Sequence, residues 1–166
     1  MDDPVKGAAG TDEAEVKPTE AETKPMKYKP FYLKTKTEDM IKYGKKAVAM
    51  FPRRERQTAD AIRETMLEMY RLTIMIERKY YKKTTLQELD TDLEILRHFV
   101  RLAADPDYYD ERIPKKENGK PVKDKDGHTV TVKMQPPLPF KKYQVWSEML
   151  DEIGKIIGGY MKTLKG

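Results

Sequence analysis

The chain has 166 residues, a formal net charge of +5 and no cysteine, and 37% of its residues are charged. This length suits one domain with a hydrophobic core, and without cysteine the chain has neither disulfides nor thiolate metal sites. No apolar run approaches the roughly 20 residues of a membrane span, and the first residues lack the basic and apolar regions of a signal peptide. We therefore expect a cytoplasmic protein with no membrane partner.

Charge is distributed unevenly along the chain. Residues 1–24 contain seven acidic side chains and three lysines, a net charge of −4 that leaves +9 for the rest. A basic body indicates an anionic partner, although a well-solvated surface explains the charge equally well. Residues 1–30 are rich in Pro, Glu and Lys and bury too little apolar surface to offset their ordering entropy. We expect a disordered tail over 1–30 and a folded domain over 31–166.

Two helices are predicted before the middle of the chain. The first runs from about Thr37, a favourable N-cap, to Met50, and Pro52 ends it or turns the chain. The second begins near Arg53 and continues to about Lys82. Its apolar seam alternates by four and three residues, as in helix bundles. The seam consists of Ile62, Met66, Met69, Thr73, Ile76 and Tyr80.

Two further helices show the same kind of seam. The third begins at Thr84 or Thr85, with Glu88 as a capping-box partner, and ends at Asp105. The fourth covers about 140–164. Their seams consist of Leu86, Leu89, Leu93, Leu96, Val100 and Ala103, and of Trp146, Leu150, Ile153, Ile157, Tyr160 and Leu164. Four such helices predict an all-α fold, an antiparallel four-helix bundle.

An insertion over 107–139 separates the third and fourth helices. It is long for a connection in a bundle. It contains the turn signals Asn118-Gly119 and Asp126-Gly127, followed by the alternating, β-branched stretch "HTVTVK". We predict a small β-hairpin that turns at one of these two sites.

Apolar residues outside the seams indicate contacts between copies of the chain. Leu67, Ile74 and Phe99 lie off the seams, and exposed they would form an apolar patch. The alternative is a wide core stripe on each helix. Gly154 and Gly158 are four residues apart, so a neighbouring backbone can approach that side of the helix closely. The alternative for the glycines is fraying near the end of the chain.

Basic residues accumulate on the second and third predicted helices, as a rigid cationic face for phosphate binding requires. The alternative is a solvated face with intrahelical ion pairs. The candidate nucleic-acid-binding residues are Arg53, Arg54, Arg56, Arg63, Arg71, Arg78, Lys82, Arg97 and Arg101.

Residues typical of catalysis are scarce. His98 and His128 are the only histidines, and no glycine-rich phosphate loop precedes a lysine. We see no cluster with metal-ligand spacing. We therefore assign no catalytic residue, no metal site and no cofactor.

Three stretches together resemble a known family. They are "FPRRERQTADAI" (Phe51–Ile62), "LEILRHFVRLAAD" (Leu93–Asp105) and "YQVWSEMLDEIGKIIGGYMK" (Tyr143–Lys162). Over roughly 38–105 and 140–164 the chain resembles the accessory variability determinant of diversity-generating retroelements. It is also similar to the wider four-helix-bundle family that includes proteins encoded in ribosomal RNA intervening sequences.

This resemblance implies a homopentameric barrel of four-helix protomers, which binds a reverse transcriptase and RNA or DNA without catalysing a reaction. The complex of that family uses template RNA to make complementary DNA altered at adenine positions. Arg53, Arg54 and Arg56 match the family's basic group after Phe-Pro, and Arg97 and Arg101 match its paired arginines. Gly154, Lys155 and Gly158 match the signature of the fourth helix. The alternative function is a helical oligomeric scaffold that binds only protein partners.

Overall fold

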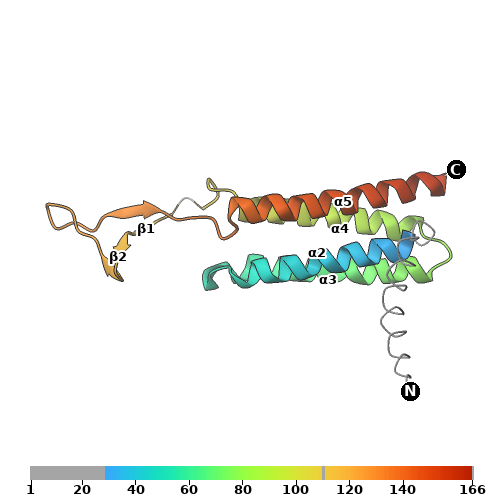
Figure 1. Cartoon of the computed structure of the whole chain (residues 1–166), viewed down its shortest axis with the longest axis horizontal. Coiled ribbons are helices and arrows are strands. Elements are labelled where there is room, and N and C mark those ends of the chain that lie inside the picture. Colours follow the sequence, from blue (N-terminus) through green and yellow to red (C-terminus); the bar gives the residue numbers. More distant parts are fainter. Residues whose placement is uncertain (1–28, 110, 166) are drawn as a thin grey trace, which may run out of the picture.

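The computed structural model describes residues 29–109 and 111–165. Within them, helices α2 (Lys29–Ala49), α3 (Arg56–Arg78), α4 (Lys83–Ala103) and α5 (Phe140–Lys165) form a bundle, and a short 3-10 helix, η2 (Arg53–Glu55), precedes α3. Each helix packs against the two beside it, and successive helices run in opposite directions (Figure 1). The predicted antiparallel four-helix bundle is therefore confirmed.

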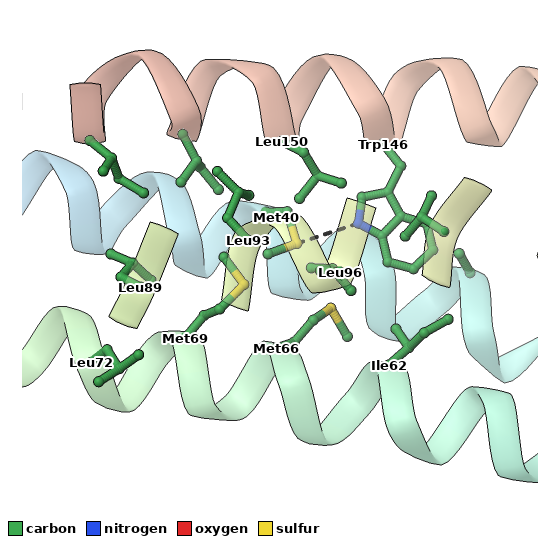
Figure 2. Packing of buried hydrophobic residues seen from close by; sticks show 14 of the residues in the cluster. Met40, Ile62, Met66, Met69, Leu72, Leu89, Leu93, Leu96, Trp146 and Leu150 are labelled. Atoms are coloured by element: carbon green, nitrogen blue, oxygen red, sulfur yellow. Dashed lines mark hydrogen bonds between the residues drawn. The ribbon is translucent and has the colours of Figure 1, made fainter. Parts of the chain in front are cut away.

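The seams predicted from the sequence form the core. On α3, α4 and α5 the seam residues are buried over most of each helix, and α2 adds Leu33, Met40, Ala47 and Val48. The side chains converge between the four helices, with Trp146 among Met40, Met66 and Leu150 (Figure 2). The Trp146 indole N–H donates to Met40 Sδ at 3.4 Å, which gives the single tryptophan a partner inside the core.

Two helix boundaries differ from the sequence prediction. Helix α2 begins at Lys29, so Thr37 is not an N-cap: it is buried within the helix and its hydroxyl donates to the Leu33 carbonyl at 2.9 Å. Threonine bonds to nearby backbone both at caps and inside helices, so its presence alone does not fix a boundary. Most of the predicted tail, residues 1–28, lies outside the described residues.

Helix α3 ends at Arg78 rather than near Lys82, so Tyr80 leaves the predicted seam and is fully exposed. Helix α4 begins at Lys83, without a side-chain hydrogen bond at its N-cap. Thr85 is buried in its first turn and accepts a hydrogen bond from Lys79 at 3.1 Å. The capping box predicted with Thr85 is therefore wrong.

The insertion forms an arm that extends from one end of the bundle (Figure 1). Its stem is an antiparallel pair of β1 (Arg112–Pro114) and β4 (Thr131–Lys133). A second pair, β2 (Lys116–Glu117) and β3 (Lys120–Pro121), turns at Asn118-Gly119, where both residues have positive φ. The chain turns again at Gly127, beside an isolated bridge between Lys123 and Thr129. The chain thus turns at both of the alternative sites, and the insertion is a branched arm instead of the single predicted hairpin.

Candidate nucleic-acid interface

Basic side chains gather at the end of the bundle that carries the arm. The segments nearest the arm, 42–64, 97–105 and 140–150, contain eleven Lys and Arg residues against five Asp and Glu residues. The segments farther from the arm, 32–41, 65–96 and 151–164, contain nine basic and ten acidic residues. The positive potential of the bundle is therefore concentrated at the arm end, where a polyanion is attracted most strongly.

The far half has acidic groups close together. Asp92 on α4 lies near Glu68 on α3 and Glu88 on α4, and its burial together with these charges raises the pKa of its carboxyl. Arg71 donates to Glu68 at 2.6 Å, and this hydrogen bond lowers the pKa of the Glu68 carboxyl. Arg71 is thereby held by an acid of its own helix and does not form part of an open cationic face.

Pairing divides the predicted nucleic-acid-binding residues. Arg53, Arg78 and Arg101 are exposed and have no acidic partner among the described side chains. Arg56 is 80% exposed, with Asp60 as far as 3.9 Å away, whereas Arg63 lies 3.0 Å from the same carboxylate. Arg53, Arg56 and Arg101 all lie at the arm end, but Arg78 ends α3 at the opposite end.

Two other candidates make contacts within the protomer, close to connections between helices. Arg54 contacts Met134, the residue that follows the arm stem. Lys82 follows the end of α3 and its ammonium group donates to the Ile76 carbonyl at 2.9 Å. A cation at this position satisfies a carbonyl that the helix leaves unpaired. Both side chains are engaged within the protomer.

Arg97 connects α4 to α5. Its guanidinium donates to the Asp151 carboxylate at 2.6 Å and to the Leu150 carbonyl at 3.4 Å, and Glu94 lies 3.7 Å away. The Arg97 guanidinium also lies against Gly154 of α5, where a Cβ would be only 2.6 Å from it. Gly154 thus makes room for an arginine of the same chain.

The residues expected to pack between copies lie on two separate faces. Leu67 and Ile74 are exposed on α3, on either side of Tyr70, whose hydroxyl donates to Glu38 of α2 at 2.7 Å. On α4, a groove of about 350 Å³ lies on the outer side of the helix. It is lined by Thr91, Glu94, Ile95, His98, Phe99 and Leu102. Gly158 on α5 has no described atom within 4 Å of the position that a Cβ would occupy.

Several exposed cations at the arm end were not among the predicted residues. Lys42, Lys45 and Lys46 are exposed on the last turns of α2. Their sequence spacing places them on neighbouring positions of one helix, a signal that was available from the sequence. The arm adds exposed lysines that no helical periodicity could have identified.

The base of the arm is fastened to the bundle. The buried Tyr109 donates its hydroxyl to Glu55 of η2 at 3.0 Å, and burial together with this bond raises its pKa far above the ordinary value. The Leu138 amide donates to the Ala103 carbonyl at 3.1 Å on the return of the chain. These contacts fix where the arm leaves the bundle, beside Arg53 and Arg54.

Three side chains of the kinds that bind metal ions lie together at one tip of the arm, although the sequence spacing indicated no metal site. Asp124, Asp126 and His128 are exposed and can bring one ligand atom each to within 4.8 Å of one another. The Asp124 carboxylate accepts the amides of Asp126 and His128 at 2.9 and 2.8 Å. These bonds shape the turn, which explains the cluster without an ion.

Comparison with known proteins identifies a family. A model of the family described as bAvd-like matches residues 31–117, more than half of the chain. No curated protein matches the chain. In the described part of the chain, no helix combines the length and apolar character that crossing a bilayer requires.

Proposed function

The chain belongs to the bAvd-like family, and from this premise we propose that it binds nucleic acid and the reverse transcriptase of a diversity-generating retroelement. Family membership indicates an accessory, non-catalytic protein of such an element. In this role the chain supports mutagenic reverse transcription while the polymerase performs the chemistry. The template RNA and the complementary DNA are the nucleic acids that it would meet there.

The observation that carries the proposal is the segregation of charge along the bundle. The arm-end segments contain eleven basic residues and only five acidic ones. Among the basic residues, Lys46, Arg53 and Arg101 are exposed without an acidic partner among the described side chains. Cations held on rigid helices bind phosphates without reading sequence. This property suits a protein that must hold many different complementary DNAs.

The direct test is nucleic-acid binding across a range of salt concentrations. In one variant Lys46, Arg53 and Arg101 are changed to Glu, which removes three free cations from the arm end. In the matched control Lys83 and Lys162, with Lys155, are changed to Glu; all three are exposed in the far half. Binding of labelled RNA and duplex DNA is measured by fluorescence anisotropy.

We expect the arm-end variant to bind weakly and the far-half control to bind like the parent. The dependence of log affinity on log salt should fall by about 0.9 for each duplex phosphate that the variant no longer neutralises. Equal losses of affinity in both variants would mean that only the overall charge matters. A parent chain that ignores both nucleic acids at low salt would leave the scaffold for protein partners as the better function.

Binding to the reverse transcriptase is tested with the polymerase of the same element. We expect the parent chain to retain it in a pull-down and to raise the yield of altered complementary DNA in a reconstituted reaction. Because the proposed role is non-catalytic, the chain alone should extend no primer. Failure to retain the polymerase would contradict this part of the proposal even where nucleic acid is bound.

We further propose that protomers assemble head to tail into a ring, with five copies as the family resemblance implies. The support is the pair of dissimilar apolar faces, Leu67 with Ile74 on α3 and the groove around Ile95 on α4. Two different faces that fit each other form a heterologous contact, which closes into a ring when the rotation permits. Burying both faces would remove an apolar patch from water.

The assembly is tested by light scattering at micromolar concentration. The parent should have a mass several times 19.4 kDa. Changing Leu67 to Glu or Ile95 to Glu should each break the ring, because either substitution spoils one face of every contact. The exposed Val145 of α5, changed to Glu, serves as a control outside both faces. A monomeric parent would refute the ring.

A further inference from the structure

The arm is a branched structure with two tips. The chain passes through one junction three times, at Lys115, Val122 and Val130. There the Lys115 amide donates to the Val130 carbonyl, the Val130 amide to the Val122 carbonyl, and the Val122 amide to the Lys115 carbonyl, at 2.8–2.9 Å. These three bonds form a closed cycle. From this junction one branch ends at Asn118-Gly119 and the other at the turn around Gly127 (Figure 1). The directions of both tips are therefore set by backbone bonds.

The arm has almost no core of its own. Between 112 and 133 every side chain is exposed or half-buried, and none is fully buried. Isolated two-stranded ribbons are only marginally stable in water. The arm is instead supported at its base, where Tyr109 and Met134 are buried and contact Glu55 and Arg54 of η2. A supported, projecting and solvated ribbon is the form of an element that contacts a partner.

The composition of the arm indicates the chemistry of that partner. Residues 112–133 contain seven basic side chains against three acidic ones, and no Phe, Tyr or Trp. Protein interfaces are enriched in aromatic residues and depleted in lysine. Single-stranded nucleic acid is typically held by stacking its bases on aromatic rings. Lysines without aromatics suit the phosphates of a duplex, whose bases stay stacked.

Contacts within the protomer divide the seven cations of the arm into two groups, and Lys133, 3.9 Å from Asp107, belongs to the group with partners. Arg112 donates to Thr131 at 2.7 and 2.8 Å, and Lys123 donates to Thr129 at 3.0 Å, so both support the ribbon. Four other lysines are exposed, and their ammonium groups have no partner within the described residues. They are Lys115, Lys116, Lys120 and Lys125, distributed over both branches.

We infer that the forked arm, residues 112–133, is a second binding element that contacts the phosphate backbone of a nucleic-acid duplex through these four lysines. The inference deepens the proposed function, because the arm leaves the bundle beside Arg53 and continues the same positive surface outward. A two-stranded ribbon is narrow enough to enter the major groove of B-form DNA. The arm lengthens the duplex site without adding sequence preference.

Edge strands also carry lysine to prevent pairing with other chains. This role does not account for Lys125, which lies in the turn beyond the strands. The two explanations make different predictions for binding, because protective lysines can be neutralised without any loss of affinity for a duplex.

The test uses the full chain with the four lysines changed to Gln, and a matched control in which Lys79, Lys83, Lys155 and Lys162 of the bundle are changed to Gln. Both variants lose four exposed charges, and both should show the circular dichroism spectrum of the parent. We expect the arm variant alone to bind a duplex about tenfold or more weakly near 0.1 M salt, with a smaller salt dependence.

A position-specific measurement removes dependence on affinity alone. Because the chain contains no cysteine, Lys125→Cys can carry a single photoreactive label. It should cross-link to a bound duplex, whereas the same label at Lys162→Cys in α5 should not. Cross-linking to duplex in the second variant and not the first would overturn the inference.

The outcomes separate the arm from the bundle. If the arm variant binds duplex like the parent while the variant of Lys46, Arg53 and Arg101 does not, the arm inference fails and the proposed function stands. The reverse result refutes the bundle end and supports the arm. A loss confined to single strands, or a loss only of polymerase retention, overturns the assignment to duplex phosphates. If the parent binds no nucleic acid, both proposals fail.

Discussion

Gly44 is a buried residue that has no room for a side chain. It lies on α2, where a Cβ would be 2.6 Å from Met66 Sδ and 2.6 Å from Cζ2 of Trp146. Both distances are shorter than van der Waals contact. Met66 is flexible, but Trp146 is fully buried and held by its bond to Met40, so the indole has no space to retreat.

The expected effect of Gly44→Ala is the difference between two terms. Forcing an extra carbon into a packed core costs about 1–3 kcal/mol, and replacing glycine by alanine inside a helix returns about 1 kcal/mol. We therefore expect a net loss of about 1 kcal/mol in the free energy of unfolding. Gly158→Ala is the control, because its Cβ meets no described atom within 4 Å, and in the dilute chain it should gain about 0.5–1 kcal/mol.

Urea unfolding followed by circular dichroism measures both variants, at one protomer concentration because any assembly shifts apparent stability. In a Trp146→Phe background the indole atoms that clash with Gly44→Ala are gone, so alanine should cost less there than in the parent. Such a coupling identifies the clash with Trp146 as the cause. The reasoning is refuted if Gly44→Ala stabilises the parent as much as Gly158→Ala does.

Three further predictions concern side chains whose roles the structure separates. Tyr109→Phe should lower the free energy of unfolding by about 1 kcal/mol, because Glu55 loses its buried donor; urea titration at neutral pH measures this. The raised pKa of Tyr109 keeps its phenol protonated in the folded chain, so the parent should lose stability as the pH rises above about 10, where unfolded tyrosine ionises. Tyr109→Phe should flatten that loss, and equal slopes in both proteins would contradict it. Arg97→Gln should destabilise the fold by about 1 kcal/mol through its contact with Asp151 and leave the salt dependence of nucleic-acid binding unchanged. Arg101→Gln should leave the stability of the fold unchanged and reduce that salt dependence.

The helical core could be predicted from the sequence because its signal is periodic. A seam such as Leu86 to Val100 repeats every three or four residues, and a side chain out of register would expose its apolar surface to water. The ends of the helices have no such periodic signal, since they depend on single residues. Thr37 resembled a cap and lies inside a helix, and Tyr80 continued the α3 seam in sequence although the helix had already ended.

The partners in close contacts between helices could not be predicted from the sequence. Gly44 did not stand out, because one glycine in a helix has many explanations until its neighbours are known. Gly154 did stand out, but the side chain that fills the space beside it is Arg97 of the same chain. Gly158 is open in the protomer, and light scattering of Gly158→Leu would test whether it packs against a second copy.

The candidate interface shows why counting cations along a helix is insufficient. The spacing of Arg63 and Arg71 places them on one outer face, yet each has a carboxylate three residues before it and is paired with it. Arg53 and Arg101 are far apart in sequence, and both lie at the arm end of the bundle because η2 and the last turn of α4 are at that end. A phosphate competes with existing ion pairs for a cation, so unpaired cations at a shared end contribute more to binding than a longer row of paired ones. Neutralising Arg63 and Arg71 should therefore weaken binding less than neutralising Arg53 and Arg101, although each variant removes two charges, and anisotropy titrations at one salt concentration measure the difference. Equal losses would show that pairing within α3 is too weak to withhold these arginines from a polyanion, and the interface would then extend along the whole helix.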